Sequence, residues 1–545
     1  MAGGSALTLD IILSGGLVVD GTGNPWFKAD VGVKDGRIVK VGKLKGFQAE
    51  KVIDVRGLVV APGFIDMHSH SDLTLWVNPK IDNKIRQGVT TEVVGNCGTS
   101  PAPLKGEALK EAERFIESLP GGTGKKPNWS TLAEYHRRLE EQGVPVNVAV
   151  LLGHSTIRMC VMGCKGGPPT GSEMDEMKAL VAQGMEEGAF GISTGLVYAP
   201  GCYAETSEII ELARVVAEYG GIYVTHMRNE GNHLYDALRE AIKIGKCAGL
   251  PVHISHHKAA GRLNWGKVKV TLKIMEDARR NGVDITCDVY PYTAGCTWSL
   301  SPVLPNWILE GGVEAMIERL RNPEVRERIR RQVREGVGVS PLLELGEWDS
   351  IVIGAVKTEK NRRFEGKTLA EIAEMRGVDP LDCIFDLIVE EEDEITSFFF
   401  TMNEEDVHYV IKHPLSMIGS DAVPQRKSGL VHPRCYGTFP RVIRRYVNET
   451  RTLTLEEAIR KMTSAPAQRL GLRDRGQIRE GFWADITVFN PRTIRDEATY
   501  EDPYRYPVGI EYVLVNGTVA VEEGRYNGSL AGKVLRKETE KTAAS

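Results

Sequence analysis

The amino-acid sequence predicts an α/β fold, in which a (β/α)8 barrel of the TIM type is joined to a small β-sandwich made from both ends of the chain. Two observations predict this architecture. Short alternating strand patterns broken by glycine occur at the two ends, and apolar strands alternate with amphipathic helical segments in the middle. A third observation supports it, because polar side chains suited to metal binding end several of the middle strands.

The β-sandwich is predicted from residues 1–62 and 476–545. The first range contains "ADVGVKDGRIVKVGKL" and the second contains "IEYVLVNGTVAVEEGRY". Apolar and polar residues alternate in both with the period of two that is typical of half-buried strands, and "DG" pairs mark hairpin turns. Because the two ends of a domain often lie close together, we expect one small domain built from both chain ends.

The barrel is predicted from residues 63–475. Helical patterns such as "TSEIIELARVVAEYG" separate most of its candidate strands, which favours a closed parallel sheet. The strands are, in chain order, "GFIDMHSH", "TTEVVGNCG", "VNVAVLLGHS", "FGISTG", "IYVTHMR", "VHISHH", "DITCDVYPY" and "SMIGSD". The long interval between the last two, at about 297–412, is predicted to be an insertion that covers the mouth of the barrel.

Composition excludes some classes of function. The 68 basic and 73 acidic residues leave a net charge of −5, so no basic field attracts nucleic acid. The chain shows no secretory signal and no apolar run near the roughly 18 residues that a membrane span needs. Its nine scattered cysteines predict reduced thiols in a cytoplasmic protein. The composition does not exclude a homo-oligomeric state.

Six polar residues end the predicted barrel strands. Barrel chemistry takes place at the carboxyl ends of the strands, where the loops begin. A single histidine, cysteine or aspartate at such a position is usually structural, as a packing residue or a helix cap. Together, imidazole, thiolate and carboxylate groups are ligands suited to zinc. The sequence therefore predicts a zinc site made from His68, His70, Cys97, His226, His256 and Asp421.

Several motifs resemble the amidohydrolase superfamily, and within it the N-acyl-D-amino-acid deacylase (D-aminoacylase) family. The resemblance rests on "GFIDMHSHSD", "GNCGTSPAP", "STGLVYAPG", "THMRNEG", "SHHK", "DVYPYTAG" and "HPRCYGTFPRVI", and it covers nearly the whole chain. Many amidohydrolases bridge two metals with a carboxylated lysine from strand four. The fourth strand here, "AFGISTG", contains no lysine, and the thiolate of Cys97 would take that place.

The resemblance implies a ligand set and a catalytic residue. It implies that Cys97, His226 and His256 bind one tightly held zinc ion, and that His68 and His70 form a second, weaker or empty position. It also implies that Asp421 contacts the metal site and acts as the general base and acid.

Residues that bind the substrate are implied in the same way. The family holds the substrate carboxylate with side chains that correspond to Tyr198, Lys258 and Tyr290. The family often has a serine where this chain has Cys296, and a thiol is a weaker hydrogen-bond donor than a hydroxyl. Arg434 has two interpretations. It could bind substrate, because guanidinium pairs well with carboxylate, or it could anchor its loop through an ion pair.

The predicted function is zinc-dependent hydrolysis of the amide bond of N-acyl-D-amino acids, which releases a carboxylic acid and a free D-amino acid. Alternatives are a cyclic-amide hydrolase of the dihydroorotase or hydantoinase kind, and a peptidase specific for D-residues that uses the same site. A non-catalytic scaffold is disfavoured, because the chain keeps all six strand-end residues. The sequence does not determine the preferred D-side chain, the acyl group or the number of metals.

Overall fold

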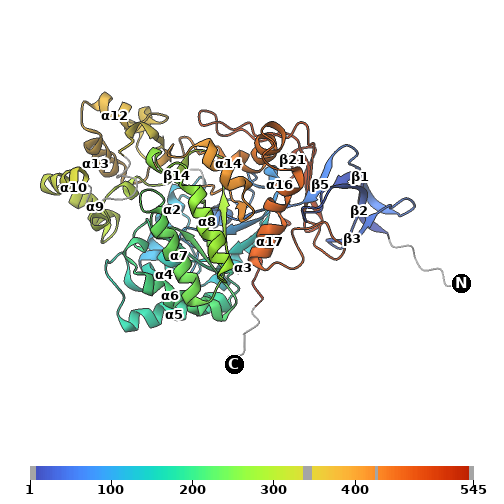
Figure 1. Ribbon diagram of the computed structural model, residues 1–545, viewed down its shortest axis with the longest axis horizontal. Helices are drawn as coiled ribbons and strands as arrows, with labels where there is room; N and C mark the ends of the chain where they lie inside the picture. Colours follow the sequence, from blue (N-terminus) through green and yellow to red (C-terminus); the bar gives the residue numbers. More distant parts are fainter. Residues whose placement is uncertain (1–7, 336–345, 424–426, 539–545) are drawn as a thin grey trace.

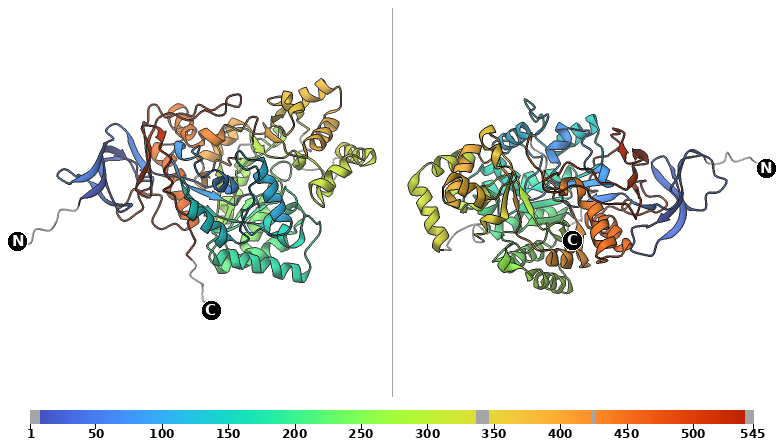
Figure 2. Two further views of the ribbon diagram at one scale, coloured as in Figure 1. Left: turned by 180° about the vertical axis from the view of Figure 1, so that it is seen from behind. Right: turned by 90° about the horizontal axis from the view of Figure 1, so that it is seen from above.

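The computed structural model describes residues 8–335, 346–423 and 427–538 (Figures 1 and 2). A ring of parallel strands surrounded by helices lies at its centre, which confirms the predicted fold class. The N-terminal strands lie at one end of the molecule, and a separate group of helices lies at the other end. Residues 1–7, 336–345 and 539–545, parts of the predicted sandwich and insertion, lie outside the described residues.

The ring is made of short, fully buried strands that all run in one direction. Hydrogen bonds join them into a six-stranded sheet with the order β17-β13-β12-β11-β10-β9 and a three-stranded sheet with the order β6-β7-β8. Their bounds are β6 Phe64–Asp66, β7 Val89–Val94, β8 Asn147–Val150, β9 Leu152–Gly153, β10 Gly191–Gly195, β11 Ile222–His226, β12 Val252–Ile254, β13 Ile285–Val289 and β17 Ser416–Ile418.

Backbone contacts join the two sheets at both of their edges. On one side, β8 and β9 are consecutive pieces of the same strand, separated only by Leu151. On the other side, the Asp421 amide donates to the His68 carbonyl at 2.8 Å, and a parallel bridge pairs Ser69 with Ala422. Eight strand positions therefore follow one another around a ring, in the order expected for this barrel.

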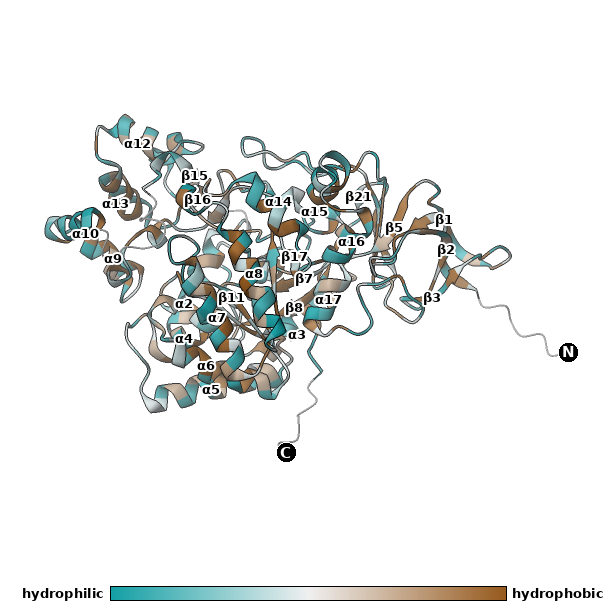
Figure 3. Ribbon diagram, in the orientation of Figure 1, coloured by the Kyte–Doolittle hydropathy of each residue, from teal (hydrophilic) through white to brown (hydrophobic). Residues whose placement is uncertain are grey.

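Helices cover the outside of the ring, and their outer surfaces are hydrophilic (Figure 3). The helices α3 and α5 begin with capping boxes, in which Thr131 pairs with Glu134 and Thr170 with Glu173. No helix within the described residues combines the length and apolarity that crossing a bilayer requires. The helices are α1 Asp72–Val77, α2 Glu107–Ser118, α3 Leu132–Gln142, α4 His154–Met162, α5 Gly171–Glu186, α6 Thr206–Glu218, α7 Leu234–Ala248, α8 Lys267–Arg280, α14 Glu404–Lys412, α15 Arg434–Arg441, α16 Leu455–Met462 and α17 Ser464–Leu470.

Strands from both chain ends form one nine-stranded sheet. Its order is β21-β20-β19-β18-β5-β1-β2-β3, and β4 pairs with β1. The antiparallel pairing of β5 with β18 joins the N-terminal part to the C-terminal part. The bounds are β1 Leu9–Val18, β2 Phe27–Lys34, β3 Arg37–Gly42, β4 Ala49–Asp54, β5 Val59–Pro62, β18 Ile486–Phe489, β19 Ile510–Val515, β20 Thr518–Glu522 and β21 Arg525–Tyr526.

Between β13 and β17 the chain leaves the barrel and builds its own core. This region contains the antiparallel sheet β14-β16-β15. The strands β15 and β16 and four helices share a buried apolar cluster that runs from Leu300 to Phe399. The helix α14, which follows, packs against α8, β13 and β17 instead. These elements are β14 Gly295–Thr297, α9 Val313–Leu320, α10 Pro323–Glu335, β15 Ile351–Ala355, α12 Leu369–Arg376, α13 Pro380–Glu391 and β16 Thr396–Phe399. The exact domain boundaries stay a prediction.

A buried ion pair ties the first barrel strand to the last. The ammonium group of Lys84 pairs with Asp66 at the end of β6 and donates to the hydroxyl of Ser420 at 2.6 Å. Asp66 also accepts the backbone amide of Ser420 at 2.8 Å. Lys84 and Asp66 are both buried, and Ser420 immediately precedes Asp421. This network therefore sets where the eighth strand delivers its aspartate.

We expect Lys84→Ala to destabilise the protein by about 3–5 kcal/mol, because it leaves the Asp66 carboxylate buried without a counter-charge. The shift in the midpoint of urea unfolding measures this loss. Lys105→Ala is the matched control, since Lys105 pairs with Glu176 at the surface and should cost less than about 1 kcal/mol. Equal midpoints for the two variants would contradict a structural role for the buried pair.

Candidate functional site

The six predicted strand-end residues converge at the carboxyl ends of the barrel strands. Their ligand atoms form two overlapping groups, and within each group the atoms all lie within 4.8 Å of one another. Cys97 belongs to both groups, and all six side chains are buried. The groups are His68, His70, Cys97 and Asp421, and Cys97, His226 and His256.

Three of these residues have an unusual backbone conformation. Cys97, His256 and Asp421 have positive φ angles of 52°, 34° and 50°. A non-glycine residue in this region costs of order 1–3 kcal/mol, and such residues cluster at functional sites. At each of these three residues the left-handed conformation bends the backbone where the chain leaves the strand. Crowding beside Cys97 also requires a glycine, because a Cβ on Gly195 would lie 2.2 Å from the Cys97 carbonyl oxygen.

The imidazoles surround the sulfur of Cys97. Its Sγ lies 3.3 Å from Nε2 of His68 and 3.5 Å from Nε2 of His256. The rings of His226 and His256 meet edge to face, with their centroids 4.4 Å apart. Nδ1 of His226 is buried and forms no hydrogen bond within the described chain. A buried nitrogen without a partner, next to a thiol and a second imidazole, fits a zinc ion, which prefers sulfur and nitrogen ligands.

Electrostatics favour the ionised forms that bind a cation. Burial alone would raise the pKa of the Cys97 thiol, but the imidazoles of His68, His226 and His256 hold the pKa well below its ordinary value. For Asp421, burial is likewise outweighed, chiefly by the Arg434 guanidinium, and the pKa lies well below its usual range. The pKa of His68 is raised well above its ordinary value despite burial, because Cys97 and Asp288 face it. The site thus attracts positive charge, which a metal ion can supply in place of protons.

The sequence analysis did not single out Glu230, a largely buried carboxylate that contacts both imidazoles of the second group. One Glu230 oxygen lies 3.0 Å from Nδ1 of His256 and 2.7 Å from Nζ of Lys258. Its other oxygen lies 3.5 Å from Nε2 of His226. With these nitrogens facing Glu230, Nε2 of His256 and Nδ1 of His226 are left to face Cys97. The motif "THMRNEG" contains Glu230, but nothing in that pattern shows which side chains it meets.

Asp288 is a second carboxylate that the sequence analysis missed. It lies at the end of β13, where it is completely buried. Its oxygens contact Nδ1 of His68 at 3.4 Å, Nε2 of His253 at 2.9 Å and the backbone amide of His256 at 2.8 Å. Such contacts fix the orientation of ligand imidazoles.

The residues proposed for the substrate carboxylate lie around the same site. Tyr198 packs edge to face on His226, with the ring centroids 5.0 Å apart. The hydroxyl of Tyr290 is buried and has no hydrogen-bond partner among the described residues. Tyr198, Lys258, Tyr290 and Cys296 all line the cavity next to the candidate metal ligands.

Arg434 lies behind this cavity. It is completely buried and forms an ion pair with Asp421 at 2.8 Å. Its guanidinium also stacks over the Tyr290 ring, 4.8 Å from the centroid, and donates to the Cys296 carbonyl at 3.3 Å. Arg434 is not among the described residues that line the cavity. Of the two interpretations, this arrangement has the features of the loop-anchoring ion pair.

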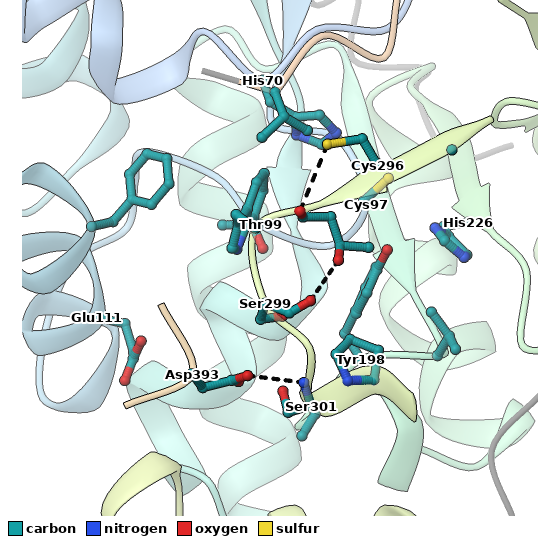
Figure 4. A pocket seen from close by; sticks show the side chains of 18 of the residues that line it. His70, Cys97, Thr99, Glu111, Tyr198, His226, Cys296, Ser299, Ser301 and Asp393 are labelled. Atoms are coloured by element: carbon teal, nitrogen blue, oxygen red, sulfur yellow. Dashed lines mark hydrogen bonds between the residues drawn. The ribbon is translucent and has the colours of Figure 1, made fainter. Parts of the chain in front are cut away.

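A cavity of about 360 Å³ opens from the candidate ligands (Figure 4). His70, Cys97, Tyr198 and His226 lie along one part of its wall. Its size and its mixed apolar and polar lining are those of a small-molecule site.

Comparison with known proteins identifies relatives over the full length. The amidohydrolase family pattern matches residues 51–521. D-aminoacylase from Alcaligenes xylosoxydans xylosoxydans is 37% identical over 97% of this chain and 98% of its own length. N-acyl-D-glutamate deacylase from the same organism is 36% identical over 97% of each chain.

A solved structure agrees. N-acyl-D-glutamate deacylase from Bordetella bronchiseptica, in complex with zinc and a phosphonate inhibitor, has a TM-score of 0.81 at 35% identity. The match covers 97% of this chain and 100% of that chain. The chain thus belongs to the amidohydrolase family, in the branch that contains D-aminoacylase and the N-acyl-D-glutamate deacylases.

Proposed function

We propose that this protein hydrolyses the amide bond of N-acyl-D-amino acids with the help of bound zinc, releasing a carboxylic acid and a free D-amino acid. The observation that carries the proposal is the convergence of Cys97, His226 and His256 beside a cavity of small-molecule size. Full-length relatives are D-aminoacylases and N-acyl-D-glutamate deacylases. A cytoplasmic location and a homo-oligomeric state stay predictions.

Zinc suits the ligand set, and we propose one tight site and one weaker site. Cys97, His226 and His256 offer a thiolate and two imidazoles, which zinc prefers over oxygen ligands. His68 and His70, with Cys97 and Asp421, offer the second position. When bound, zinc acts as a Lewis acid toward the amide carbonyl and makes water a stronger acid, with a pKa near 7 in place of 15.7.

Asp421 is positioned to move the protons of the reaction. Its Oδ1 lies 3.1 Å from Nε2 of His70 and 3.4 Å from Nε2 of His68. Its pairing with Arg434 favours the ionised carboxylate, which can accept a proton from water. The same group can then donate that proton to the departing nitrogen, so one residue serves both steps.

Lys258, Tyr198 and Tyr290 would hold the substrate carboxylate. Lys258 supplies a positive charge, and the Tyr290 hydroxyl is a donor without a partner in the described chain. Fixing the carboxylate and the carbonyl at two points leaves the position of the side chain as the third point that distinguishes the two hands of the amino acid. Cys296 lies where a hydroxyl donor would otherwise stand.

Two observations favour a linear amide over the cyclic-amide alternative. The full-length relatives are deacylases. The strand β10, with the sequence GISTG, contains no lysine that could carry a bridging carboxylate.

The function is tested with N-acetylated D- and L-amino acids, hydantoins and dipeptides that begin with a D-residue, with zinc content measured on the same preparation. We expect the N-acetyl-D-amino acids to be cleaved with at least one bound zinc per chain. Preferential cleavage of hydantoins, or of the L-substrates, would overturn the proposal.

Asp421→Asn should retain zinc and the fold but lose roughly 10²–10⁴-fold in kcat, because an amide cannot accept and return the proton. Rates on N-acetyl-D-leucine, together with metal content and thermal unfolding, measure the effect. Near-normal turnover in a variant that holds zinc would exclude Asp421 as the proton carrier.

Glu230→Gln should weaken zinc binding by roughly 10–100-fold, because the neutral amide orients the imidazoles of His226 and His256 less strongly. Competition with a chromophoric chelator measures zinc affinity. Cys97→Ala, which should lose nearly all zinc binding, is the reference for complete loss of the site. Glu208→Gln is the matched control, since buried Glu208 pairs with His154 and Arg158. Equal zinc affinity in Glu230→Gln and wild type would contradict the orienting role.

A further inference from the structure

The cavity extends well beyond the candidate metal ligands. Its far part, which we call the outer chamber, lies between α2 of the barrel and the insertion. Ala108, Ala112 and Phe115 line it from α2, and Leu309, Val313 and Met316 line it from the insertion. The wall of the outer chamber is therefore mainly apolar.

Trp298 stands between the metal ligands and the outer chamber. Its ring meets His70 edge to face, with the centroids 5.3 Å apart, and lies 5.4 Å from the ring of Phe115. The insertion thus contributes an aromatic wall that runs from the reacting centre toward α2. A group that enters the chamber passes along this wall and loses its contact with water.

Carboxylates outnumber cations in the outer chamber, since Glu111, Asp393 and Glu394 line the cavity there with Arg114. Figure 4 shows Glu111 and Asp393 beside Ser301, on the side of the pocket away from His70 and Cys97. Asp393 is buried and accepts the backbone amides of Leu300 and Ser301, each at 2.9 Å. Two carboxylates therefore lie at the end of a largely apolar space.

The basic residues of the cavity are already paired. Among the described residues that line it, the lysine and arginine are Lys258 and Arg114. Lys258 lies beside the metal ligands and donates to Glu230 at 2.7 Å. Arg114 donates to the carbonyl of Glu392, and its Nε lies 3.7 Å from Glu394. Lys258 would hold the substrate carboxylate beside the metal ligands, and Arg114 is already paired within the chamber. Neither therefore supplies a positive charge for a second anionic group in the outer chamber.

Building on the proposed function, we propose that the outer chamber takes an uncharged, bulky apolar group of the substrate and excludes one that ends in a carboxylate. Burial of apolar surface against Phe115, Met316 and their neighbours favours such a group, by about fourfold for each methylene. An anionic group would lose its hydration and face Glu111 and Asp393, while the nearby cation, Arg114, already pairs with Glu394. The group can be either the D-side chain or the acyl chain, since both extend from the amide bond that is cleaved.

Two series of substrates test this on the zinc-loaded enzyme. The first varies the side chain of N-acetyl-D-amino acids through alanine, leucine, phenylalanine and glutamate. The second varies the acyl group of D-alanine through acetyl, hexanoyl and succinyl. In the series that fills the chamber, kcat/KM should rise at least tenfold with apolar size, and the carboxylate-bearing compound should fall at least tenfold below its apolar counterpart.

Glu111→Lys probes the negative charge directly. In the responding series, this substitution should reduce the ratio of kcat/KM for the apolar compound to kcat/KM for the carboxylate-bearing compound by at least about tenfold. Glu113→Lys is the matched control, because Glu113 lies on the same helix, pairs with Lys126 and is not among the described residues that line the cavity. The ratio of the two kcat/KM values in Glu113→Lys should equal the ratio in the wild type.

The inference is overturned if neither series responds to apolar size, or if the carboxylate-bearing compound reacts as fast as its apolar counterpart. An unchanged ratio in Glu111→Lys would overturn the assignment of Glu111. If the proposed function itself is wrong, the zinc-loaded protein would cleave none of the N-acyl-D-amino acids, and this result is distinct from a lack of selectivity among cleaved substrates.

Discussion

The sulfur atom of Cys97 joins the two candidate ligand groups at this site. Its position follows from the left-handed backbone at the end of the second barrel strand, with φ at 52°, and from the close approach of Gly195. From that position Sγ reaches His68 and His256 at 3.3 and 3.5 Å. Moving this residue to an extended conformation would separate the ligands, so the rest of the site depends on a locally unfavourable bend that the barrel stabilises.

A buried site with several charges must balance them. The thiol of Cys97 and the carboxylates of Asp421, Glu230 and Asp288 are all buried or nearly so, and none is tolerated there without a partner. Arg434 neutralises Asp421, and Lys258 neutralises Glu230. The remaining negative charge is what makes the centre receptive to a divalent cation. The same need for partners gives the carboxylates their second use, which is to orient the ligand imidazoles.

The insertion encloses a substrate-sized cavity beside the candidate metal ligands. A bare barrel would leave the strand ends open to water, whereas here Trp298 and the apolar side chains of α9 enclose a cavity beside them. The insertion has its own core, and its side chains line the cavity opposite α2. Chemistry at the metal and selection of the substrate are thus assigned to different parts of the fold.

The sequence by itself determined the fold class and the types and strand positions of all six candidate ligands, because strand and helix periodicity and residue chemistry are local properties. It did not reveal Glu230 or Asp288 as partners of the imidazoles, the pairing of Arg434 with Asp421, or the outer chamber. Those contacts join residues far apart in the chain, such as Phe115 with Trp298 and Arg434 with Asp421. Only the closing of the ring and the packing of the insertion bring such residues together, since distance along the chain places no limit on distance in the fold.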